Sequence, residues 1–106
     1  MLRLIRIVGS SMEPTFRSGD LALTVAYRRP PTPAVGHVVL LRHPVFGPMV
    51  KRVRACSEGV FEVAGDGVAS TASTDLGPIR PDWISARVVC RIGLPRGRAL
   101  RRTPSP

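Results

Sequence analysis

The sequence predicts a mostly β domain, either a small antiparallel β-barrel or a folded β-sheet, and three observations support this. The chain of 106 residues holds 11 prolines and 10 glycines, which divide it into short segments rather than long helices. Its apolar residues fall in short runs that alternate or end at turn residues, a pattern typical of strands. A hydrophobic fraction of 43% indicates a folded chain, and this length suffices for one domain with one modest core.

Six strands are expected, with turns or loops between them. The predicted strands are residues 2–8, 21–27, 37–43, 49–55, 60–64 and 84–93. The segment "SEG" (57–59) predicts a hairpin turn, and "RPDWI" (80–84) predicts one helical turn. A long loop of small and polar residues spans 65–78, and loops of that length in small domains are often functional. The domain is expected to cover 1–94, followed by a basic tail at 95–106 that reads as disordered.

The formal net charge of +9 suggests an acidic partner, a nucleic acid or an anionic membrane surface. Nucleic acid is the least expected of these. Four arginines lie in the tail, the others are scattered, and the aromatic content of 5% leaves few rings on which bases could stack. The tail could still make peripheral contact with a membrane, since arginine is attracted to anionic lipid.

Cysteines and histidines do not form a pattern typical of a metal site. Cys56 and Cys90 lack both metal spacing and a disulfide framework, so we expect two buried thiols in a reducing compartment. His37 and His43 flank one predicted strand without a third ligand, and are expected at the surface or at strand ends. We therefore predict neither a metal nor a cofactor.

Lys51 is the only lysine among 16 basic residues. Arginine stays protonated in proteins, whereas a lysine can act as a general base if burial lowers its pKa. Strand alternation places Lys51 on the same face as Met49 and Val53, which is an apolar face. A lone lysine could equally be chance or an edge-strand residue. A serine on the turn "GSSMEPTFRSGD" (9–20) favours the catalytic interpretation, because serine and lysine form a known nucleophile–base pair.

Three segments together resemble the signal-peptidase-like serine proteases. "GSSMEPTFRSGD" is similar to the nucleophile box of that clan, "VKRV" (50–53) to its general-base box, and "GDGVASTASTDLG" (65–77) to its third box. The three occur in the family's order and span about two-thirds of the chain. The resemblance implies a serine endopeptidase with a Ser/Lys dyad in a signal-peptidase-like β domain with a long catalytic loop.

The resemblance also implies roles for individual residues. Ser11 would be the nucleophile, with its backbone N–H as an oxyanion donor, and Lys51 would be the general base. Ser70 matches the hydroxyl that helps to orient the lysine, with Ser73 as the competing candidate. Asp66 is expected to pair with Arg52 and hold the loop against the strand.

Substrate is expected to add as an extended strand beside an exposed edge. The resemblance implies that pockets near Met12, Met49 and Val53 would favour small residues before the cut, as in the family.

Two residues of the third box depart from the family pattern. Gly67 replaces a common asparagine and Ala72 a common acid. Both changes affect the hydrogen bonding expected within the loop, which leaves an inactive relative as one alternative.

The segments "LRHP" (41–44) and "ASTASTDLGPI" (69–79) resemble one branch in particular, the proteases that remove the N-terminal extension of nickel superoxide dismutase. Only ten residues precede Ser11, too few to span a bilayer. We therefore expect a cytoplasmic enzyme acting on that precursor. The alternatives are a membrane-associated general signal peptidase acting on secretory preproteins, and a non-enzymatic basic β-barrel that binds nucleic acid.

Overall fold

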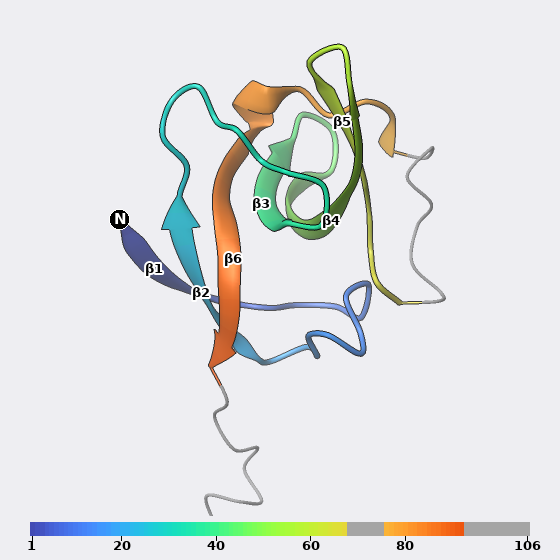
Figure 1. Ribbon diagram of the computed structural model, residues 1–106. Helices are drawn as coiled ribbons and strands as arrows, with labels where there is room; N and C mark the ends of the chain where they lie inside the picture. Colours follow the sequence, from blue (N-terminus) through green and yellow to red (C-terminus); the bar gives the residue numbers. More distant parts are fainter. Residues whose placement is uncertain (68–75, 93–106) are drawn as a thin grey trace, which may run out of the picture.

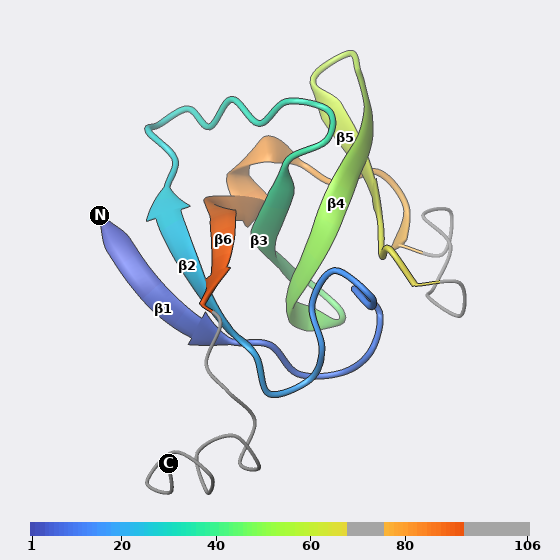
Figure 2. The ribbon, with the colours of Figure 1, turned by 60° about the horizontal axis from the view of Figure 1, so that its bottom comes forward.

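A computed structural model of the protein describes residues 1–67 and 76–92. The described chain is mostly β, and its strands form one six-stranded antiparallel sheet in the order β1-β2-β6-β3-β4-β5 (Figures 1 and 2). The strands are β1 (Leu2–Arg6), β2 (Leu21–Ala26), β3 (Val38–His43), β4 (Gly47–Ser57), β5 (Val60–Ala64) and β6 (Ile84–Ile92). All six predicted strands are thus confirmed, with small shifts at their ends.

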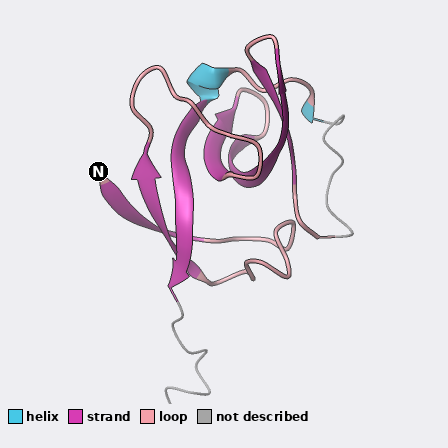
Figure 3. Ribbon diagram, viewed as in Figure 1, coloured by secondary structure: helices cyan, strands magenta, loops and turns pink. Residues whose placement is uncertain are grey.

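Turn residues define the connections between the strands. Glu58 and Gly59 both have positive φ, at 53° and 79°, as a two-residue type I′ turn between β4 and β5 requires. The predicted helical turn is also present, as the 3-10 helix η1 (Pro81–Trp83), which leads directly into β6 (Figure 3). The predicted disordered tail at 95–106 lies outside the described residues.

The sheet is curved but does not close into a barrel, so of the two predicted forms the folded sheet is correct. Within 1–67 and 76–92, β1 and β5 are the two edges of the sheet. The inner neighbour of β5 is β4, and on its outer side the described residues form a single bridge, from Phe61 to Ile79. That bridge belongs to the segment that leads to η1. This segment covers the outer edge of β5, with which β1 would have to pair if the sheet were to close into a barrel.

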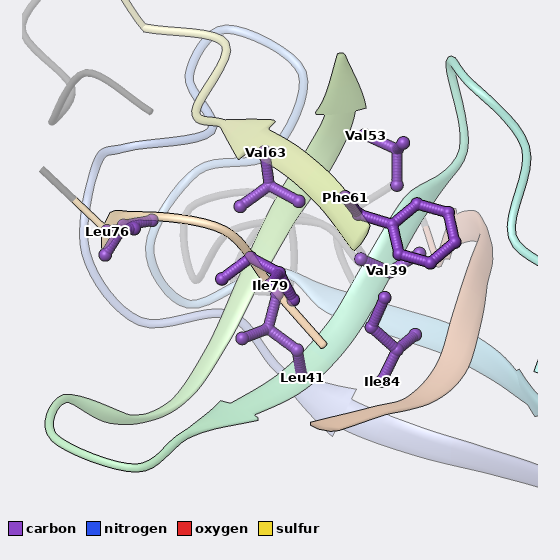
Figure 4. Packing of buried hydrophobic residues seen from close by; sticks show 8 residues of the cluster. All are labelled: Val39, Leu41, Val53, Phe61, Val63, Leu76, Ile79 and Ile84. Carbon is purple, nitrogen blue, oxygen red and sulfur yellow. The ribbon is translucent and has the colours of Figure 1, made fainter. Parts of the chain in front are cut away.

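One apolar cluster lies between β3, β4, β5 and the segment that follows β5 (Figure 4). Figure 4 shows Ile79 between Val63 of β5 and Leu41 of β3. The full cluster comprises Val39, Leu41, Val53, Phe61, Val63, Leu76, Ile79 and Ile84. Burial of these side chains fixes the far end of the 65–78 loop on the sheet.

A second cluster joins the predicted nucleophile turn to the sheet. Met12 and Phe16 of the turn are 1% and 5% exposed, and they pack with Ala22, Val38 and Val88 of three different strands. The segment 7–20 therefore runs along one end of the sheet instead of projecting from it, as Figure 2 shows. A buried methionine and a buried phenylalanine on so short a turn restrict its movement relative to the strands.

The cysteines contradict their expected burial, whereas His43 lies at a strand end as expected. Cys56 and Cys90 are exposed and unbonded, because each falls on the solvent side of its strand and not on the core side. His43 does lie at the end of β3, but it is buried. Its Nε2 is 3.1 Å from the Leu76 carbonyl oxygen, and its Nδ1 accepts a hydrogen bond from the Val45 N–H at 3.0 Å. These partners require Nε2 to carry the proton and donate.

Candidate active site

The turn that bears Ser11 is a closed loop with a rigid base. At the base, the Ile7 N–H donates to the Asp20 carbonyl at 2.8 Å and the Gly19 N–H donates to the Ile7 carbonyl at 2.7 Å. Asp20 also caps the turn, since its Oδ2 accepts the Arg17 N–H at 2.8 Å. The loop thus prolongs the pairing of β1 with β2, and its tip carries the serine.

Ser11 is half-buried, between an exposed Ser10 and the fully buried Met12. The Phe16 N–H donates to the Met12 carbonyl at 2.9 Å, a helix-like turn that follows the serine directly. In the hydrogen bonds found among 1–67 and 76–92, the Ser11 N–H donates to no acceptor. That N–H is therefore available to an oxyanion, as the resemblance implies.

Lys51 occupies the apolar face of β4 that strand alternation predicts. It is 7% exposed and lies opposite Val39 of β3, with Met49 and Val53 as its neighbours on the same face. Burial lowers the pKa of the Lys51 ammonium below its ordinary value of 10.5, because the charged form loses solvation. No ion pair to Lys51 occurs among the described residues, so nothing there offsets that effect.

Ser11 and Lys51 line the same groove, although 40 residues separate them in the sequence. The groove has a volume of about 430 Å³. One wall is β1 and the start of the turn, from Ile5 to Gly9, and the other is the 48–51 segment of β4 together with Leu40. A hydroxyl and a buried amine therefore line one hollow beside a sheet edge. None of the hydrogen bonds among residues 1–67 and 76–92 joins Ser11 to Lys51, so what the groove shows is a shared hollow and not a formed nucleophile–base pair.

Asp66 joins the third box to the strand that carries Lys51. Its carboxylate accepts two charge-assisted hydrogen bonds from Arg52, from Nε at 2.8 Å and from Nη2 at 2.7 Å, which confirms the predicted pair. Arg54 lies further away, with Nη2 at 3.4 Å from Oδ1. Hydrogen bonding to Arg52 holds the pKa of Asp66 below its ordinary range.

The same carboxylate also reaches the nucleophile turn, through a residue that the sequence did not single out. The Thr15 hydroxyl donates to Asp66 Oδ2 at 2.7 Å. Asp66 thereby links three segments: the turn, strand β4 and the start of the 65–78 loop. Thr15 lies within the quoted nucleophile box, but only the fold could show that its partner is 51 residues away.

A backbone contact brings the third box directly against Ser11. The Gly67 N–H donates to the Ser11 carbonyl at 2.9 Å. A Cβ at position 67 would lie 3.1 Å from the Glu13 carbonyl oxygen and 3.2 Å from that of Ser10. Gly67, which departs from the family pattern, therefore lets the backbones of the two segments approach closely because it has no Cβ.

No protein-family model and no curated protein sequence matches this chain. The assignment of a function therefore depends on the geometry of the site. Among the described residues, no helix is long and apolar enough to cross a membrane. Likewise, no three His, Cys, Asp or Glu side chains in the described part of the chain gather closely enough to hold a metal ion.

The remaining predicted site residues fall in three different places. Met49 lines the groove, and Met12 forms part of its floor while anchoring the turn. Val53 does not line the groove. It is 1% exposed and belongs to the first core cluster, where it pairs with Val63 of β5. Ser70 and Ser73, the two candidates for orienting the lysine, lie outside the described residues, as does Ala72.

Replacing Gly67 with alanine should displace the nucleophile turn. The added methyl group would press on the Glu13 and Ser10 carbonyl oxygens, and overpacking of this kind costs about 1–3 kcal/mol. We expect a lower melting temperature and slower cleavage of any substrate that the wild type cleaves. Gly67→Asn, which restores the family's residue, should behave no better. Unchanged melting and cleavage in both variants would show that the turn adapts freely.

Proposed function

We propose that the protein is a serine endopeptidase of the signal-peptidase-like type, with Ser11 as nucleophile and Lys51 as general base. The observation that carries this proposal is the shared groove, into which a turn serine and a buried lysine with a lowered pKa both open. The ordered resemblance of the three sequence boxes supports it. The Asp66 junction and the Gly67 contact support it further, because they hold the serine turn against the lysine strand.

The mechanism follows from these groups. Neutral Lys51 accepts the proton of the Ser11 hydroxyl as the serine oxygen attacks the scissile carbonyl. The Ser11 N–H stabilises the oxyanion of the tetrahedral intermediate. Collapse to the acyl-enzyme expels the amine, which takes the proton from Lys51. A water molecule, activated by the neutral lysine, then hydrolyses the ester and regenerates the serine.

The edge strand β1 supports binding of substrate as an added strand. The groove is lined from Ile5 to Gly9, and β1 has β2 as a neighbour on only one side within the described sheet. A peptide paired with this edge would run past Ser11 with alternate side chains directed into the groove. Met49 and Met12 then narrow the space beside the reacting bond, which favours small residues there.

Removal of an N-terminal pre-sequence is the proposed reaction, with the nickel superoxide dismutase precursor as the first candidate substrate in the cytoplasm. Secretory preproteins cleaved at a membrane are the alternative. Binding of nucleic acid by a basic β domain is the non-enzymatic alternative, and the overall charge of +9 is the observation in its favour.

The test is cleavage of two purified substrates by the wild type and by Ser11→Ala. One substrate is a nickel superoxide dismutase precursor and the other a secretory preprotein in detergent. We expect cleavage of the first alone, with loss of at least about a thousandfold in the variant. Ser10→Ala is the matched control and should stay active. Cleavage by Ser11→Ala, or equal loss in Ser10→Ala, would contradict the assigned nucleophile.

A further inference from the structure

A second groove borders the turn that bears Ser11, and several of the side chains that line it carry hydrogen-bond donors. Its volume is about 320 Å³, and it lies between the turn, the segment 36–38 and the end of β6. The polar and charged residues that line it are Thr15, His37, Arg52, Arg87 and Arg91. We call this hollow the arginine groove. Among residues 1–67 and 76–92, no Asp or Glu lines it.

Two of its three arginines have no partner within the described chain. Arg52 is bound by Asp66 and by the Gly36 carbonyl, at 2.8 Å from Nη1. Arg87 and Arg91 are exposed on β6, and neither forms a hydrogen bond or an ion pair among residues 1–67 and 76–92. Gathering like charges in one hollow destabilises a free protein, whereas an anionic ligand would remove that repulsion.

His37 adds a neutral donor to the same groove. Its Nδ1 lies 2.8 Å from the Tyr27 hydroxyl and accepts the Ala34 N–H at 3.2 Å, so its proton is on Nε2. Burial, with a smaller contribution from Arg87, lowers the pKa of His37. The groove therefore offers guanidinium and imidazole N–H groups, a set that matches carboxylate oxygens.

We infer that the arginine groove binds an acidic stretch of the protein substrate, at a site separate from the cleavage groove. This inference rests on the proposed function. Thr15 and Phe16 line the arginine groove and Ser11 and Met12 line the cleavage groove, so one short turn separates the two. The same turn therefore contributes lining residues to both grooves. A nucleic acid is less well matched, because the Phe16 ring in this lining is only 5% exposed and the His37 ring is stacked with Tyr27.

The test is direct binding of a fluorescein-labelled octaglutamate peptide to the full-length Ser11→Ala chain, measured by fluorescence anisotropy. We expect binding that weakens as salt rises. The double variant Arg87→Gln, Arg91→Gln should lose about tenfold or more in affinity, since charge-assisted hydrogen bonds are the stronger ones. The matched control, Arg3→Gln with Arg42→Gln, makes the same charge change in another hollow and should stay within about twofold.

Three outcomes would overturn the inference. Equal losses of affinity in the two double variants would show that the net charge of the protein alone explains the binding. Absence of measurable peptide binding to the Ser11→Ala chain at low salt would show that the arginine groove is not a binding site for acidic peptides. Tighter, Arg87- and Arg91-dependent binding of an equally charged single-stranded oligodeoxynucleotide would assign the groove to nucleic acid. The readout needs no cleavage, so an inactive wild type would contradict the proposed function while leaving this binding result to stand on its own.

Discussion

Lys51→Arg should lower kcat by about a hundredfold to ten-thousandfold at every pH, which is the range expected when a general base is lost. Arginine keeps a charge at position 51 but cannot release its proton near neutral pH. The wild-type rate should rise with pH as Lys51 loses its proton, with a midpoint below 10.5 because burial lowers its pKa. A pH profile of kcat/KM measures this. An active Lys51→Arg enzyme would contradict the assigned base.

Lys51→Met is the matched variant that separates catalysis from stability. Methionine has a similar length without a charge, so this enzyme should be inactive and yet more stable than the wild type at pH 7. The sign follows from the lowered pKa. Between the folded-state pKa and 10.5, the unfolded chain binds more protons than the folded one, so wild-type stability rises with pH. The advantage of Lys51→Met should therefore shrink as pH increases through that window. Denaturant unfolding at several pH values would measure it.

Asp66→Asn should destabilise the protein by about 2 kcal/mol and slow cleavage, because it weakens a junction between three segments. The Asp66 side chain is only 10% exposed and that of Arg52 only 27%, so loss of the carboxylate leaves a partly buried guanidinium without its charge partner. The Thr15 contact would also weaken, and with it the position of the nucleophile turn. Chemical unfolding and kcat together measure this effect.

The control is Asp82→Asn, which removes the carboxylate of an exposed pair. Arg80 and Asp82 are 3.2 Å apart, with side chains 65% and 66% exposed, so we expect a change within about 0.5 kcal/mol. Because the pKa of Asp66 lies below its ordinary 3.8, its contribution is complete above that pH and is lost as pH falls through the lower folded-state value. The difference between wild type and Asp66→Asn should thus vanish in acid. An equal loss of stability in Asp66→Asn and Asp82→Asn would contradict the role of Asp66 as a junction between the three segments.

Local patterns in the sequence predicted the elements of the fold and the surroundings of the lysine. Period-2 alternation bounded by proline and glycine located all six strands, since a strand's apolar run and its turn residues are local properties. The same alternation put Lys51 on an apolar face, and the structure buries it there. The pairing of Asp66 with Arg52 was also predicted, although from a resemblance and not from spacing.

Other features depended on how the curved sheet brings distant segments together. Alternation separates two faces of a strand, but it cannot show which parts of a face another segment covers. Val53 and Lys51 share a face, yet Val53 is buried in the first core cluster, to which Leu76 and Ile79 also belong, whereas Lys51 lines the groove. The exposure of Cys56 and Cys90 was also mispredicted, because each lies on the solvent side of its strand. The bond from Thr15 to Asp66 and the close approach of Gly67 to Ser10 join segments more than 50 residues apart, and only tertiary packing determines such contacts.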